Sequence, residues 1–330
     1  MTRKVLATAA ALAAYLVAIP FLLRDSPYLL GVVTTASMLS FISLGVWLTF
    51  AIGRINIGQA AFALIGGYVT AVMTTAAGAS FWLALPASGL IAALLALVIG
   101  WPILRLRGVY FAMLTLSLTE AVRLAALNLA GLTRGATGIL NIPPPGPLAL
   151  FGFVLVPGFS AGNEDLAFYY LAAGTLIAGL LLIYRIDRCR LGWIFRSLRQ
   201  DEGLAAGIGI DVAKYRMAAF AICSGFAGIG GAFFTASQQS IYPSSFTVPD
   251  SIFFMLYCFL GGLSYVFGPV AGTFVLFLSF ELLAELRQYQ TLIYAMIMIL
   301  AMLWLPNGLL SLRMAPAGLG RRIPTPPRRP

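Results

Sequence analysis

The sequence predicts an all-α, polytopic membrane protein with about eight to ten transmembrane helices and both termini in the cytoplasm. Two observations carry this prediction. The 330 residues are 60% hydrophobic and only 10% charged, whereas a soluble domain is about 25% charged. The apolar runs approach the roughly 20 residues that a helix needs to cross the hydrocarbon core, and they exceed the length of a barrel strand.

Ten apolar runs are candidate spans. The third, eighth and ninth are short and are therefore candidates for half-helices or re-entrant segments. The first run follows Arg3 and Lys4. It is longer than the apolar core of a signal peptide and precedes no small-residue cleavage site, so we expect it to be retained. The candidate spans are 5–23, 28–50, 60–77, 81–104, 109–127, 166–184, 217–236, 251–267, 270–286 and 291–305.

The Lys and Arg residues orient these spans. With a cytoplasmic N-terminus and strict alternation, seventeen of the 21 basic residues fall on the cytoplasmic side. Because cytoplasmic loops are enriched in Lys and Arg, the asymmetry supports an even number of crossings. We therefore divide the chain into a transmembrane domain (1–305), a central cytoplasmic loop within it (185–216) and a cytoplasmic tail (306–330). The proline and arginine content of the tail predicts disorder.

The composition argues against several classes of chemistry. The chain has no histidine, and its three cysteines show no CxxC spacing, so we expect neither a metal site nor a catalytic residue. The chain contains no G-x-x-x-x-G-K-[ST] phosphate loop, and we therefore expect it to bind no ATP or other cofactor. The net charge of +10 is explained by loop orientation, and nucleic-acid binding is not expected.

The central loop, residues 185–216, holds seven basic and four acidic residues between two apolar spans. Residues 189–199 form a basic amphipathic stretch suited to a membrane surface. Acidic residues favour the first turn of a helix, and the segment that follows 201–202 carries little side-chain bulk. This pattern predicts close docking of a partner, with the next helix anchored at the interface. The residues that we expect to form this docking and anchoring surface are Asp201, Glu202, Ala205, Ala206, Gly207, Gly209, Lys214 and Tyr215.

Residues 53–59 place two glycines and a polar tripeptide between apolar runs. Non-helical backbone at membrane depth is tolerated where it is buried in protein or lines a water-filled cavity; a simple tight turn is the alternative. In the span 109–127, Glu120 is an intramembrane acid and so a functional candidate. An ion pair with Arg123, three residues on, is its simpler role. The candidate residues of a solute path are Asn56, Gln59, Thr115 and Glu120.

Two glycine-rich stretches predict close helix packing or hinges. In 224–232 a glycine recurs every three residues, and in 261–272 a Gly-Pro pair interrupts the helix. The candidate packing or hinge residues are Gly225, Gly228, Gly231, Gly261, Gly262, Gly268 and Pro269. The outer loop, 128–165, is expected to be either a docking platform or a passive connection.

Five stretches of the chain resemble the LivM-type permease subunit of branched-chain amino-acid ABC importers. The central loop belongs to the fourth stretch and comes directly before its motif. The resemblance covers roughly residues 30 to 305, and it is specific because all five stretches occur in the same order as in the family. The motifs are GRINIGQAAFALIGGY (53–68), RLRGVYFAMLTLSLTEAVR (105–123), TRGATGI (133–139), AFAICSGFAGIGGAF (219–233) and FLGGLSYVFGPVAGT (259–273).

The resemblance implies a non-enzymatic transport subunit in the bacterial inner membrane that moves branched-chain or other hydrophobic amino acids. It implies four kinds of contact: a second homologous permease subunit, two cytoplasmic ATPase subunits that hold ATP and magnesium, a periplasmic substrate-binding protein, and membrane lipid. The central loop becomes the ATPase-coupling loop, with Glu202, Ala205, Gly209 and Tyr215 at matching positions. Gly203 and Ala206 depart from the family's usual alanine- and acid-rich run.

Other functions stay open at this point. The same architecture also suits urea or short-chain amides as substrates. An ATP-independent secondary transporter would need intramembrane charges for ion coupling, and few are present. An intramembrane enzyme would need a catalytic set, which is missing. For an importer, we expect ATPase closure to push residues 201–209 and to tilt the glycine-rich helix that follows, which changes the side to which the path opens.

Overall fold

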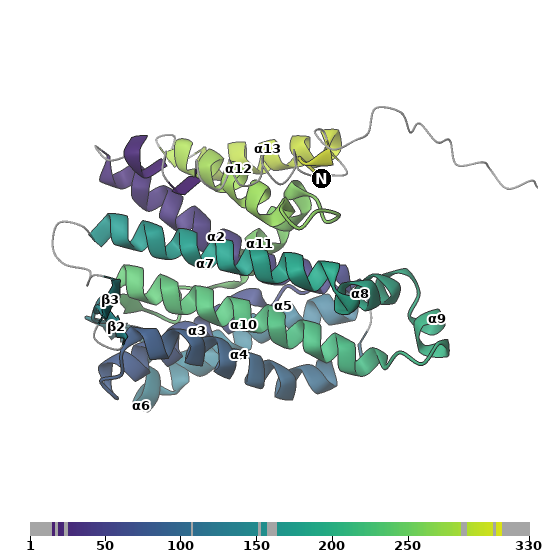
Figure 1. The fold of residues 1–330 in the computed structure, drawn as a ribbon, viewed down its shortest axis with the longest axis horizontal. Coiled ribbons are helices and arrows are strands. Elements are labelled where there is room, and N and C mark those ends of the chain that lie inside the picture. The colour runs from purple at the N-terminus through teal and green to yellow at the C-terminus, as the bar shows by residue number, and fades with distance from the viewer. Residues whose placement is uncertain are drawn as a thin grey trace, which may run out of the picture.

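The computed structural model describes residues 15–16, 19–22, 26–106, 108–150, 153–156, 164–284, 289–305 and 308–311. These residues are almost entirely helical, and the long helices run along the long axis of the molecule (Figure 1). The predicted all-α class is confirmed. The predicted first span (5–23) and the tail (306–330) lie largely outside the described residues.

Five helices in the described part of the chain are long and apolar enough to cross a membrane. With 20 to 27 residues each, they extend about 30 to 40 Å, against a hydrocarbon core of about 30 Å. They match five of the predicted spans. They are α2 (Pro27–Ala51), α4 (Phe81–Ile103), α5 (Val109–Asn128), α7 (Glu164–Arg188) and α10 (Val212–Gln238).

Four apolar helices are shorter: α3 (Gln59–Thr75), α11 (Val248–Gly261), α12 (Gly268–Leu282) and α13 (Gln290–Trp304). The bounds 251–267 predicted for the eighth span are wrong. α11 ends at Gly261 because Gly262 has a φ of 108°, which only glycine adopts readily, and a turn precedes α12. Pro269 then lies in the first turn of α12, where its missing N–H breaks no helical hydrogen bond.

Helix α10 lies at the centre and packs against α2, α3 and α4. Its glycines permit very close contact. A Cβ atom on Gly231 would overlap the carbonyl oxygen of Ala63, and one on Gly66 would overlap the backbone of Gly228. Small residues at such positions let helix backbones approach in a membrane, where dispersion contacts hold helices together.

The two ends of the bundle differ. Helices α8 (Arg190–Gln200) and α9 (Glu202–Gly207) extend beyond the bundle at one end, and α6 (Ala130–Thr133) and two short strands lie at the other (Figure 1). These strands, β2 (Leu148–Leu150) and β3 (Phe153–Val156), form an antiparallel pair. The 3-10 helix η1 (Gly135–Thr137) precedes strand β1 (Ile139–Leu140), which pairs with β4 (Ser240–Ile241) in antiparallel register.

Candidate functional site

Helix α3 begins deep inside the bundle. The side-chain amide of Gln59 donates hydrogen bonds to the carbonyl oxygens of Ile42 at 3.2 Å and Cys223 at 3.0 Å, which lie near the midpoints of α2 and α10. The chain therefore folds back inward over residues 52–58 before α3 starts. This is irregular backbone at membrane depth, of the kind that is stable only when protein surrounds it.

The first N–H groups of a helix have no partner within the helix. At the start of α3, buried side chains accept the hydrogen bonds that water would otherwise take. Asn56, Gln59 and Thr115 are fully buried and Ser251 is 1% exposed. The pairs are Gly58 N–H to Asn56 Oδ1 at 2.9 Å, Ile57 N–H to Thr115 Oγ1 at 3.1 Å, and Ala60 N–H to Ser251 Oγ at 3.0 Å.

Three of the four candidate path residues thus lie in one polar cluster. Asn56 donates to Gln59 across 3.3 Å, and Thr115 contacts the same backbone segment. Glu120 is placed elsewhere, because its carboxylate forms an ion pair with Arg123 at 2.5 Å and its side chain is 42% exposed. The geometry of Glu120 therefore agrees with the simpler role, a structural ion pair.

Helix α11 also starts at this cluster. Ser251 in its first turn contacts Thr119 in the middle of α5 at 3.2 Å, in addition to its bond with Ala60. α11 then runs toward the turn where the carbonyl oxygen of Leu263 accepts a hydrogen bond from Trp47 at 3.1 Å. α3 runs the opposite way and passes β4, where a Cβ atom on Gly67 would overlap the side chain of Ile241. Transporters place their sites beside such broken helices near the membrane midplane.

The central loop forms α8, α9 and the start of α10. Oδ1 of Asp201 caps α9 by accepting from the N–H groups of Gly203 at 2.7 Å and Leu204 at 3.0 Å. The loop residues fall into two groups. Ala205 is buried against α8, and Tyr215 is half-buried beside it, whereas Ala206, Gly207, Gly209 and Lys214 are exposed.

Two apolar side chains at α9 are exposed, one within the helix and one directly after its last residue. Leu204 is 74% exposed and Ile208 is 77% exposed, and they lie four residues apart, on one face. Neither residue was among those predicted from the sequence to act in this loop. The i, i+4 spacing of apolar residues within a polar loop was the available signal. Small residues around two protruding apolar side chains make a surface suited to protein contact.

Glu202 connects this surface to the interior. Its carboxylate lies 3.2 Å from the guanidinium of Arg54 and also pairs with Arg216. Arg54 is 4% exposed and donates to the carbonyl oxygen of Leu106 at 2.8 Å. Buried guanidinium groups require a compensating carboxylate, and here it comes from α9. The sequence predicted a role for Glu202 in the loop but not these two partners.

Comparison with known proteins assigns the family. Residues 28–304 match the family model described as branched-chain amino acid transport system / permease component. The chain belongs to this family. It is 33% identical over 320 residues to the high-affinity branched-chain amino acid transport system permease protein LivM of Escherichia coli (strain K12). The aligned region covers 90% of this chain and 75% of the relative.

Two other relatives agree. LivM of Salmonella typhimurium is 33% identical over 302 residues, with 86% of this chain and 70% of the relative covered. A probable branched-chain amino acid transport permease protein LivH of Methanocaldococcus jannaschii is 24% identical over 272 residues, with 79% and 82% covered. No solved structure matches the chain. The permease resemblance seen in the sequence is confirmed, and the chain is a multi-pass transport subunit of the bacterial inner membrane.

Proposed function

We propose that this permease works in an ATP-driven importer and moves branched-chain or other hydrophobic amino acids across the inner membrane. The observation that carries the ATP coupling is the connection between α9 and the polar cluster. Glu202 pairs with Arg54, and Arg54 is two residues from Asn56 in the segment that precedes α3. The names of the curated relatives support the substrate class.

The proposed complex contains a second homologous permease subunit, two cytoplasmic ATPase subunits and a periplasmic binding protein. ATP and magnesium would bind on the ATPase subunits, and this chain would bind no cofactor. The exposed face of α9, with Leu204 and Ile208, would dock on an ATPase subunit. Two apolar side chains surrounded by glycine and alanine would let the backbone of a partner approach α9 closely, as a mechanical connection requires.

Force on α9 has two routes into the membrane. Through Arg54 it reaches residues 52–58 and the start of α3, whose N–H groups are held by side chains of α5 and α11. Through Arg216 it reaches the base of α10, which packs mainly on α2, α3 and α4. Movement of α9 would therefore shift α3 and α10 together and change the exposure of the polar cluster.

The test is uptake of radiolabelled leucine by the complex purified through this chain and reconstituted in proteoliposomes. We expect ATP-dependent uptake that unlabelled isoleucine and valine reduce and that urea does not. If urea or acetamide reduced the uptake and isoleucine and valine did not, the amino-acid proposal would be wrong and the amide alternative would take its place. Uptake without ATP, driven by an ion gradient, would refute the ATP-coupled one.

The docking role of α9 is tested separately with the double variant L204S/I208S. Both side chains are exposed, so the fold should be preserved while ATPase subunits co-purify at a lower yield. The matched control is Leu132→Ser, a residue 60% exposed at the opposite end of the molecule. Equal recovery of the ATPase subunits with the double variant would remove α9 from the contact.

A further inference from the structure

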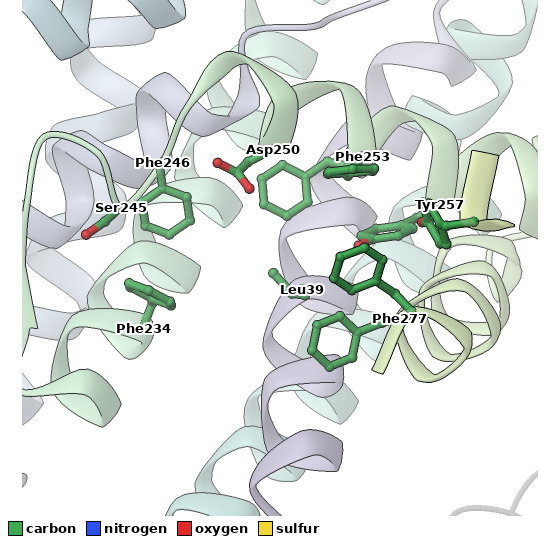
Figure 2. A pocket seen from close by; sticks show the side chains of 11 residues that line it. Leu39, Phe234, Ser245, Phe246, Asp250, Phe253, Tyr257 and Phe277 are labelled. Atoms are coloured by element: carbon green, nitrogen blue, oxygen red, sulfur yellow. The ribbon is translucent and has the colours of Figure 1, made fainter. Parts of the chain in front are cut away.

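A cavity of about 190 Å³ opens beside the first turn of α11. Eight of its eleven lining residues are aromatic, and they come from α10, α11, α12, α13 and the segment before α11. Figure 2 shows Phe246 and Phe253 on one side, Phe234 and Phe277 across from them, and Leu39 of α2 between the two sides. The rings pack against one another. Those of Phe280 and Tyr294, for example, lie edge to face with their centroids 5.1 Å apart.

The carboxylate in this apolar wall belongs to Asp250 (Figure 2). One oxygen, Oδ2, accepts from the backbone N–H of Thr247 at 2.7 Å and from its hydroxyl at 2.6 Å, which caps α11. The other oxygen accepts no hydrogen bond from the described part of the chain, and no Lys or Arg described there pairs with this carboxylate. A half-buried carboxylate next to aromatic faces is an environment that favours a ligand cation.

We propose that this cavity binds the transported amino acid, with the ammonium group at Asp250 and the aliphatic side chain among the phenylalanine rings. The inference rests on the proposed function and adds the residues that select the substrate. The cavity is smaller than the roughly 300–1,000 Å³ of sites for drug-sized molecules, which suits a small amino acid. Aromatic walls give favourable burial to a branched aliphatic group and offer little to urea, which needs several hydrogen-bond partners.

The position of the cavity fits this role. Asp250 is adjacent in sequence to Ser251, which accepts the hydrogen bond of Ala60 at the start of α3. The cavity therefore adjoins the backbone that Glu202 and Arg54 connect to α9. A movement of α3 or α11 that alters the polar cluster would also reshape this cavity.

The test measures binding of radiolabelled leucine to the purified complex in lipid nanodiscs, without the binding protein. The competitor 4-methylpentanoate has the side chain and carboxylate of leucine but no ammonium group. We expect leucine to bind and 4-methylpentanoate to compete poorly. D250N should weaken leucine binding about tenfold or more and reduce the discrimination between the two compounds, since the amide oxygen still caps α11 but carries no charge.

Two further variants separate recognition from folding. T247V removes the capping hydroxyl and keeps the carboxylate, so it should retain the preference for leucine. F277A enlarges the cavity and should shift preference from leucine toward phenylalanine, a change that misfolding would not produce. Unchanged leucine affinity and discrimination in D250N would overturn the assignment, as would a wild-type complex that imports leucine but binds none in nanodiscs. A wild-type complex that imports no aliphatic amino acid at all would instead refute the proposed function.

Discussion

Glu202 and Arg54 meet at 3.2 Å although 148 residues separate them in the chain. The carboxylate comes from α9, outside the bundle, and the guanidinium is buried where the chain folds back toward α3. Arg216 at the base of α10 shares the same carboxylate. One acidic side chain thus joins the exposed helix to the two elements that surround the polar cluster.

The first prediction is that Glu202→Gln uncouples ATP hydrolysis from transport. The variant keeps the size of the side chain and removes the charge that two buried arginines share. Glu202 is 26% exposed, but its change leaves two buried guanidinium groups without a carboxylate, so we expect the free energy of unfolding to fall by about 3 kcal/mol. Leucine imported per ATP hydrolysed should fall about tenfold, measured in proteoliposomes with both quantities followed together.

Asp187→Asn is the matched control for this variant, because Asp187 is 23% exposed but pairs at 3.0 Å with Arg196, which is 45% exposed, on the neighbouring α7–α8 corner. Exposed pairs contribute little, so its import per ATP should stay at the wild-type value. A Glu202→Gln complex with the wild-type ratio would show that the ion pairs do not transmit movement.

The second prediction concerns the start of α3. Gln59→Leu keeps a similar volume but removes an amide that bonds to α2, α10 and Asn56. Because the buried partners lose their hydrogen bonds, the free energy of unfolding should fall by about 1–3 kcal/mol. The midpoint of thermal unfolding in detergent measures this loss. Gln238→Leu, at the exposed end of α10, is the control; equal midpoints for the two variants would contradict the prediction.

The third prediction tests the glycine contacts of α10. A methyl group at Gly231 would overlap the carbonyl of Ala63, so Gly231→Ala forces α3 and α10 apart. Such overpacking costs about 1–3 kcal/mol. Gly174→Ala on α7 meets open space and should be neutral or slightly stabilising. A lowered unfolding midpoint for Gly231→Ala alone is expected, and the reverse order would contradict the packing assigned to α10.

The fold class and most helix positions follow from the sequence because hydrophobic length is a strong constraint in a membrane. The helix ends are less predictable. The run from Ser251 continues in apolar residues to Phe267, yet the helix stops at Gly261, since the backbone of Gly262 adopts a conformation outside the helical region. Hydropathy contains no information about that dihedral angle.

The candidate sites show the same limit. Asn56 and Gln59 were recognisable as polar residues between apolar runs, but their partners in α2, α5 and α10 are remote in sequence. Asp250 was not among the predicted site residues, because the predicted span began one residue after it. The pair Thr247 and Asp250 has the spacing of a capping box, which was the local signal for an earlier helix start. The contacts of Arg54 depend on tertiary packing and had no local signal.

The last prediction concerns the docking of α9, where two glycines give different tests. Gly209 has a φ of 86°, so a tryptophan there strains the backbone, and lost uptake would have two explanations. Gly207 ends α9, and no atom lies within 4 Å of a Cβ added to it. Gly207→Trp should therefore fold normally and obstruct a partner, which removes ATPase subunits from the purified complex and abolishes ATP-driven leucine uptake. Gly131→Trp, with equally open surroundings on α6, should leave both unchanged. Wild-type uptake by Gly207→Trp would mean that no partner approaches α9 closely.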